Sequence, residues 1–148
     1  MPKTKITKLH YLVREPKIKS NTPPLIIMLH GVGSNEEDLF SLANNLPDKF
    51  LVVSARGPIT LGPGSYGWYH LDMSTGKIIY DKLEAEKART TIIQFLQDLK
   101  TEHSYDPSQV YLMGFSQGSI MSLSVALTRP DLIKGVAVMS GRLLEEIK

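Results

Sequence analysis

Short aliphatic runs that alternate with helical patterns are the feature that most constrains how this sequence can fold. Continuous, mainly aliphatic runs of three to five residues predict strands that are covered on both faces. They occur at Leu25–Leu29, Leu51–Val53, Val110–Met113 and Val136–Met139. Helical patterns lie between them, from about Ser34 onward, from Glu84 to about Glu102 and from Gln117 to Thr128. Because strands and helices alternate, we expect the α/β class, with right-handed crossovers and a mostly parallel sheet that has helices on both faces.

The flanking segments refine this expectation. Residues from about Ile6 to Val13 predict a further strand, and Ser34 with Glu37 forms a capping-box pattern at the start of the first helix. The stretch from Arg56 to about Ile79 is rich in Gly and Pro and predicts a long irregular loop, which in a compact domain is usually functional or mobile. Ligands of parallel sheets bind at the carboxyl ends of the strands, so a site is expected in the segments that follow them.

Composition narrows the class of protein. The chain has 148 residues, which suits one domain with a real core, and we interpret residues 1–148 as a single domain. The formal net charge is only +2, which gives no reason to expect nucleic acid as a partner. There is no cysteine, so a thiolate nucleophile and a cysteine metal site are excluded. The N-terminus lacks the apolar core of a signal peptide and no aliphatic run could span a bilayer, so we expect a cytoplasmic protein without stable membrane insertion.

The segment Gly114-Phe115-Ser116-Gln117-Gly118 lies between a predicted strand and a predicted helix. This is the G-x-S-x-G pattern of a nucleophile elbow, in the strand–turn–helix context that the elbow requires. Such a turn projects the serine hydroxyl clear of the sheet, and glycines without a Cβ atom let the strand and the helix approach closely. The pattern alone is weak, because about one chain in twenty of this length has a chance match. The context favours Ser116 as a catalytic nucleophile.

A second glycine-rich segment, His30-Gly31-Val32-Gly33, ends the Leu25–Leu29 strand just before a helix. In elbow-type hydrolases this connection supplies one backbone amide of the oxyanion hole, and the residue after the serine supplies the other. We therefore predict an oxyanion hole made by the N–H groups of Val32 and Gln117, with their side chains incidental to that role. For His30 we expect hydrogen bonds that support the loop, and a role as general base is the disfavoured alternative.

These segments, in order along nearly the whole chain, resemble the phospholipase/carboxylesterase family of α/β-hydrolases, which includes small bacterial esterases and acyl-protein thioesterases. The similar segments are Leu29-His30-Gly31-Val32-Gly33, Ala55-Arg56-Gly57-Pro58, Gly67-Trp68-Tyr69, Val110–Gly118 and Val138-Met139-Ser140-Gly141. The resemblance implies an α/β-hydrolase fold and hydrolysis of carboxylic esters or thioesters through an acyl-enzyme on Ser116, with lysophospholipids among the candidate substrates. It implies a small-molecule ester as the partner, and neither a metal nor an organic cofactor.

The resemblance also places Trp68 and Tyr69 in the loop that lines the acyl pocket, so both are predicted to bind substrate. Trp68 is the only tryptophan and lies in a glycine-rich stretch, so it could also pin that loop to the body of the protein, and the two roles are compatible. Asp72, Asp81 and Asp131 are expected as caps or solvated charges rather than as catalytic groups.

The catalytic residues of this fold follow the order serine, acid, histidine. After Ser116 the chain has Asp131, Glu145 and Glu146 but no histidine. By resemblance, the family's acid and histidine fall beyond Lys148 together with the last strands of the sheet, so we expect a C-terminally incomplete hydrolase domain. Two alternatives stay open: a catalytically inactive protein that binds acyl ligands, and a chain that needs a second chain for its acid and histidine.

Two further hypotheses concern single segments. In an incomplete domain the Val136–Met139 strand would be uncovered, and an unpaired aliphatic edge favours self-association.

Gly31-Val32-Gly33 could also be a phosphate-binding loop of a nucleotide site. That hypothesis is weak, because neither a third glycine nor a P-loop lysine follows at the required spacing.

Overall fold

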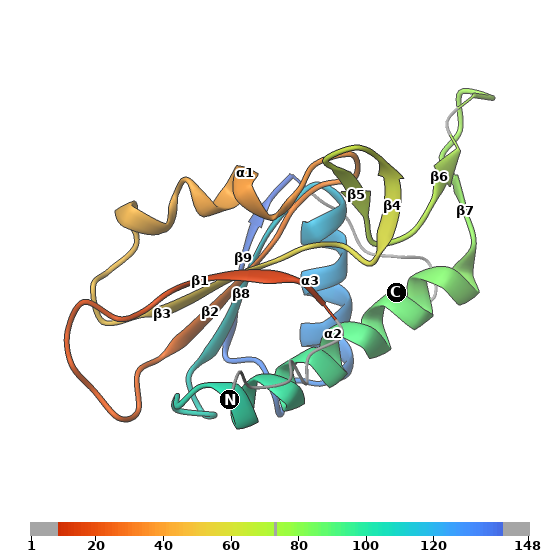
Figure 1. Ribbon diagram of the computed structural model, residues 1–148. Helices are drawn as coiled ribbons and strands as arrows, with labels where there is room; N and C mark the ends of the chain where they lie inside the picture. The colour runs from red at the N-terminus through yellow and green to blue at the C-terminus, as the bar shows by residue number, and fades with distance from the viewer. Residues whose placement is uncertain (1–8, 73, 141–148) are drawn as a thin grey trace.

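The centre of the molecule, a computed structural model that describes residues 9–72 and 74–140, is a five-stranded sheet (Figure 1). Its strands are β1 (Tyr11–Arg14), β2 (Leu25–Leu29), β3 (Leu51–Ala55), β8 (Val110–Phe115) and β9 (Gly135–Met139), in the order β1-β3-β2-β8-β9. Among these strands β1 alone runs antiparallel to its neighbour, while β3, β2, β8 and β9 are parallel to one another. The predicted mostly parallel sheet is confirmed, and each aliphatic run forms one of its strands.

Helices cover both faces of this sheet, as predicted. α1 (Glu36–Phe40), followed by a 3-10 turn at Ala43–Asn45, lies on one face, and α2 (Lys82–Glu102) and α3 (Gln117–Thr128) lie on the other (Figure 1). Alternate residues of β2 divide between two cores, because successive side chains of a strand point to opposite faces. Ile26 and Met28 belong to the core beside α1, whereas Ile27 and Leu29 belong to the larger core beside α2 and α3. Burial on both faces explains why the whole strand is aliphatic.

The first helix differs from the sequence prediction. It is short, its N-cap is Asn35, and the Asn35 side chain accepts hydrogen bonds from the N–H groups of Glu37 and Asp38. The predicted capping box of Ser34 and Glu37 is therefore wrong. Ser34 is unavailable as a cap because it forms a β-bridge with Tyr66, in the stretch that follows β3.

That glycine-rich stretch, predicted as an irregular loop, contains two small hairpins. β4 (Ile59–Gly62) pairs with β5 (Ser65–Gly67), and β6 (Leu71–Asp72) pairs with β7 (Ile79–Tyr80). The first hairpin turns at Gly64, whose φ of +68° suits glycine and few other residues. In Figure 1 the second hairpin projects away from the sheet beyond the start of α2. The β4–β5 hairpin is the one that bears on the site, because it lies against the loop that follows β2.

Candidate active site

Ser116 occupies the sharp turn between β8 and α3. Its backbone angles, φ 54° and ψ −114°, lie in a region that residues other than glycine rarely adopt. Two hydrogen bonds hold it there, because its N–H donates to the carbonyl of Met139 at 3.0 Å and its carbonyl accepts from the N–H of Ile120 at 3.1 Å. A strained backbone that the surrounding structure holds in place is typical of functional turns, and this conformation is that of a nucleophile elbow.

Two glycines make the turn sterically possible. A Cβ atom on Gly118 would lie 1.8 Å from the carbonyl oxygen of Leu29, and one on Gly114 would lie 2.4 Å from the backbone of Gly118. A side chain at either position would push α3 away from β2 and β8, because a packed interior has no room for it. The glycines of the G-x-S-x-G pattern are thus required by packing around Ser116.

The loop after β2 reaches the same turn. A Cβ atom on Gly31 would lie 3.3 Å from the Cβ of Ser116, so the two segments are in direct contact. The backbone N–H groups of Val32 and Gln117 donate no hydrogen bond to any other residue that the structure describes. Gln117 is the first residue of α3, where unpaired amides carry partial positive charge. Two amide donors, one in the residue after Ser116 and one in the residue after Gly31, are therefore without an acceptor in the described part of the chain.

The β4–β5 hairpin fixes this loop from its other side. Gly33 donates to the carbonyl of Tyr66 at 2.7 Å, and Tyr66 donates back to the carbonyl of Ser34 at 2.8 Å. The Ser65 hydroxyl adds a hydrogen bond to the carbonyl of Gly33 at 3.0 Å. Residues 33 and 34 are therefore bound to β5, which holds the loop directly after Val32 in place.

His30 lies at the start of the loop and is fully buried. Its Nε2 accepts from the N–H of Gly57 at 2.9 Å, so the ring proton resides on Nδ1, which donates to the carbonyl of Gly31 at 2.7 Å. Burial lowers the pKa of His30, and the hydrogen bond to Gly31 and the charge of Glu36 offset this only in part. The ring is neutral with both nitrogens engaged. The expected support of the loop is confirmed, and no ring nitrogen is left to act as a general base.

The side chain of Gln117 is buried as well, with 1% of its surface exposed. Its Oε1 accepts from the N–H of Trp68 at 2.7 Å, and its Nε2 donates to the carbonyl of Tyr69 at 2.8 Å. That this side chain is incidental to the oxyanion hole stays a prediction, but the side chain has a separate structural role, because it holds the segment between β5 and β6 against the elbow. The G-x-S-x-G pattern leaves this position open, so the sequence carried no signal for the contact.

Trp68 and Tyr69 themselves lie in the core, with 1% and 0% of their surface exposed. The indole Nε1 of Trp68 donates to the carbonyl of His30 at 2.9 Å, and the ring of Tyr69 lies 5.5 Å from that of Tyr80. These contacts support the alternative in which Trp68 pins its loop to the body of the protein. A substrate-binding role for either side chain stays a prediction.

Comparison with known proteins identifies the family. A family model described as Phospholipase/Carboxylesterase matches residues 11–148. The chain belongs to the phospholipase/carboxylesterase family. It is 29% identical, over 80% of its length, to poly(3-hydroxyalkanoate) depolymerase C of Paucimonas lemoignei, and 27% identical, over 84% of its length, to acyl-protein thioesterase 1 of Emericella nidulans.

Solved structures agree with this assignment. Esterase PE8 matches 94% of the chain with a TM-score of 0.77 at 29% identity, and the Bacillus cereus carboxylesterase matches 97% with a TM-score of 0.81 at 22% identity. The α/β-hydrolase fold is thus confirmed. This family member spans 28% of the depolymerase, 59% of the thioesterase, 66% of esterase PE8 and 65% of the carboxylesterase. Within residues 9–72 and 74–140, no helix combines the length and the apolar character needed to cross a bilayer.

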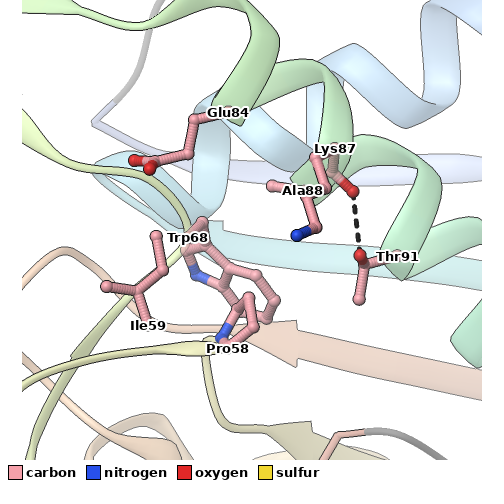
Figure 2. Close-up of a pocket in the computed structure, with 7 residues that line it drawn as sticks. All are labelled: Pro58, Ile59, Trp68, Glu84, Lys87, Ala88 and Thr91. Atoms are coloured by element: carbon pink, nitrogen blue, oxygen red, sulfur yellow. Dashed lines mark hydrogen bonds between the residues drawn. The ribbon is translucent and has the colours of Figure 1, made fainter.

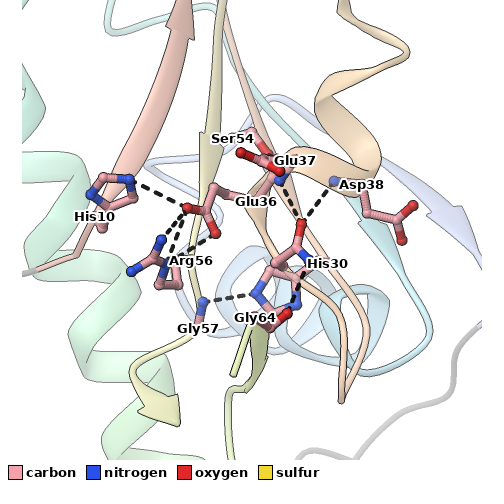
Figure 3. A network of polar contacts seen from close by, with 10 residues as sticks. His10, His30, Glu36, Glu37, Asp38, Ser54, Arg56, Gly57 and Gly64 are labelled. Atoms are coloured by element: carbon pink, nitrogen blue, oxygen red, sulfur yellow. Dashed lines mark hydrogen bonds and ion pairs between the residues drawn. The ribbon is translucent and has the colours of Figure 1, made fainter. Parts of the chain in front are cut away.

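A buried ion pair in this phospholipase/carboxylesterase domain lies beside the loop after β2 (Figure 3). The carboxylate of Glu36 accepts from Nε and Nη2 of Arg56 at 2.6–3.1 Å, and His10 lies 3.3 Å away. The Arg56 guanidinium also stacks 4.4 Å from the ring of Tyr66. Burial alone would raise the pKa of Glu36, but the hydrogen bonds and charge of Arg56, a backbone hydrogen bond and the charge of His10 together outweigh it, so the pKa is lowered. The pair ties α1, β3 and the β4–β5 hairpin together. Sequence reasoning missed it, because a glutamate in a first helical turn ordinarily faces solvent.

A cavity of about 180 Å³ lies between β4 and the first turns of α2 (Figure 2). Its lining combines apolar, polar and charged side chains and consists of Pro58, Ile59, Trp68, Glu84, Lys87, Ala88 and Thr91. Because Trp68 belongs to the segment held by Gln117, this cavity adjoins the elbow through that segment.

The histidines other than His30 contact groups other than Ser116. His10 pairs with Glu36 at 3.3 Å, His70 pairs through Nδ1 with Glu84 at 2.9 Å, and His103 is hydrogen-bonded to the hydroxyl of Tyr11 at 3.0 Å.

The acidic residues behave as expected from the sequence. Asp81 is the N-cap of α2, Asp72 accepts hydrogen bonds from Ser74, and Asp131 pairs with Arg129 at 2.9 Å. These carboxylates are therefore caps and surface charges.

Proposed function

We propose that Ser116 is the nucleophile of a serine hydrolase that cleaves small-molecule carboxylic esters, with thioesters and lysophospholipids as further candidate substrates. One observation carries the proposal: the strained Ser116 contacts Gly31 and is followed by Gln117, and the amides of Gln117 and of Val32, the residue after Gly31, have no acceptor among the described residues. Fixed amides of this kind stabilise the oxygen that becomes negative when a nucleophile adds to a carbonyl. Membership of a family of esterases and thioesterases supports the same chemistry.

The reaction would proceed in two steps. The Ser116 hydroxyl attacks the ester carbonyl carbon, its proton passes to a base, and the alcohol or thiol leaves with a proton returned to it. Water then cleaves the acyl-serine ester and regenerates the hydroxyl. In both steps the amides of Val32 and Gln117 hold the oxyanion, and no cofactor enters the scheme.

The base is the part of the scheme that the described residues do not supply. All four histidines precede Ser116 in the sequence, and each is bonded elsewhere. We propose that an acid and a histidine from outside these 148 residues complete the site. The same observation favours the second candidate function, an inactive domain that binds acyl ligands or that pairs with another chain.

Hydrolysis of p-nitrophenyl butyrate by the 148-residue chain tests the proposal, with Ser116→Ala as the diagnostic variant and the exposed Ser104→Ala as its control. We expect slow hydrolysis that depends on Ser116, on the order of 10⁴- to 10⁶-fold below an esterase with a complete triad. Equal rates in the chain and in Ser116→Ala would reject Ser116 as the nucleophile. Rapid turnover that is lost in Ser116→Ala would place a base inside the chain, and His70 would be the first candidate.

Two other expectations remain proposals. β9 is the last strand of the sheet in the described residues, with Val138 43% exposed, so we propose self-association through this edge at high concentration. Light scattering that shows a monomer at every concentration would contradict it. A cytoplasmic location also remains a proposal.

A further inference from the structure

The Gln117 carboxamide is placed between the nucleophile elbow and the segment that leads from β5 to β6. Its backbone follows Ser116 directly, while its side chain uses both polar ends on the main chain of Trp68 and Tyr69. β5 ends at Gly67 and β6 begins at Leu71, so neither hairpin ladder pairs the groups that Gln117 binds. The carboxamide therefore supplies the hydrogen bonds to the main chain of this segment that a neighbouring strand would otherwise supply.

The fit around this contact is close. A Cβ atom on Gly67 would lie 3.4 Å from Cγ2 of Val32 and 3.5 Å from Oε1 of Gln117. The segment thus passes next to both residues that we propose for the oxyanion hole. A buried polar side chain costs free energy unless its hydrogen bonds are made, and both polar ends of this carboxamide have a partner. The contact is therefore specific to an amide side chain.

We propose that Gln117 is a positioning residue that sets the place of the Trp68–Tyr69 segment relative to Ser116. This inference rests on the proposed function for its effect on substrate, although the contact itself does not depend on catalysis. The residue would act twice: its backbone N–H binds the oxyanion, and its side chain fixes the wall that includes Trp68 and the cavity of about 180 Å³ beside it (Figure 2). Loss of the side chain should then weaken substrate binding while the oxyanion amide remains.

Trp68 reports on this contact directly, because it is the only tryptophan of the chain and is 1% exposed. We would compare Gln117→Met, which keeps most of the volume and loses both hydrogen bonds, with Gln97→Met on the exposed face of α2. The expected result is red-shifted Trp68 emission and at least about twofold stronger acrylamide quenching in Gln117→Met, with Gln97→Met unchanged. Identical emission and quenching in a folded Gln117→Met would overturn the proposal.

Hydrogen exchange of the unmodified chain tests the same contact without any variant. The backbone amide of Trp68 and the side-chain amide of Gln117 should exchange at least about a hundredfold more slowly than the side-chain amide of Gln97, because buried hydrogen bonds must open before exchange. Similar rates for the two glutamine side chains would refute the placement even if Gln117→Met failed to fold.

The activity test separates this inference from the proposed function. If the chain hydrolyses p-nitrophenyl butyrate through Ser116, Gln117→Met should raise KM roughly tenfold and change kcat less than about threefold. A fall of about a hundredfold in kcat with KM unchanged would contradict positioning and assign the side chain to the oxyanion instead. If no Ser116-dependent hydrolysis is found, the proposed function fails, and the emission and exchange results still decide the role of Gln117.

Discussion

Replacement of Gly118 by alanine tests the packing of the elbow most sharply. The new Cβ atom would lie 1.8 Å from the carbonyl oxygen of Leu29 and 2.6 Å from that of His30, distances that real Cβ atoms essentially never show. Both neighbours are backbone atoms in fully buried residues, so no side chain can move aside. α3 would have to separate from β2 by more than about 1 Å, a gap that forfeits a quarter to a half of each dispersion contact along the interface.

We therefore expect Gly118→Ala to lower the free energy of unfolding by at least about 3 kcal/mol, the upper end of the range for overpacked cores. That is a large part of the roughly 5–15 kcal/mol that stabilises a domain. Urea unfolding followed by far-UV circular dichroism measures it. Gly62→Ala is the matched control, because nothing lies within 4 Å of the Cβ position at Gly62. A Gly118→Ala protein within about 0.5 kcal/mol of the unmodified chain would refute the argument.

Three further predictions concern charges and caps. Arg56→Met removes the guanidinium hydrogen bonds of the buried Glu36 carboxylate and leaves the more exposed His10 as its remaining charged neighbour. It should lower the free energy of unfolding by about 2 kcal/mol, measured in urea at neutral pH, and a change below about 0.5 kcal/mol would show that the pair contributes little. The pKa of His30 is lowered in the folded chain, so the unfolded chain binds the proton more readily. The free energy of unfolding should therefore be highest above about pH 6.5 and should fall as the pH drops below that value. Urea midpoints that stay constant between about pH 7.5 and pH 5.5 would contradict this. Asp81→Ala removes the hydrogen bond that caps α2 and should lower the stability by about 1 kcal/mol, whereas the exposed Asp48→Ala should have little effect.

The parts of the fold that the sequence predicted well are those in which one physical cause dominates. β2 and β3 are buried on both faces, and continuous aliphatic runs follow directly from that burial. The α2 stripe of Ala88, Ile92 and Leu99 is buried as its helical spacing predicted. The sharp turn at Ser116 was predicted because it requires glycines at fixed positions along the chain, and this spacing is visible in the sequence.

The remaining features depend on contacts between segments that are distant in sequence. Ser34 has the local pattern of a helix cap, but its pairing with Tyr66 decides its conformation and transfers the cap to Asn35. The local sequence around the buried Glu36 is that of a surface residue, and its burial depends on the distant Arg56 and His10, which pair with its carboxylate. Gln117 occupies a position that the elbow pattern leaves open, so its hold on the Trp68 segment is apparent only in three dimensions.

Covalent labelling tests the central claim, that Ser116 is the reactive serine, most directly. The 148-residue chain and its Ser116→Ala variant would be exposed to a fluorophosphonate, and the modified residue would be located by tandem mass spectrometry. We predict a single adduct on Ser116 that is absent from Ser116→Ala. It should form slowly, because each of the four histidines contacts a group other than Ser116 in the described part of the chain. An adduct on another residue, or equal labelling of the variant, would contradict the claim.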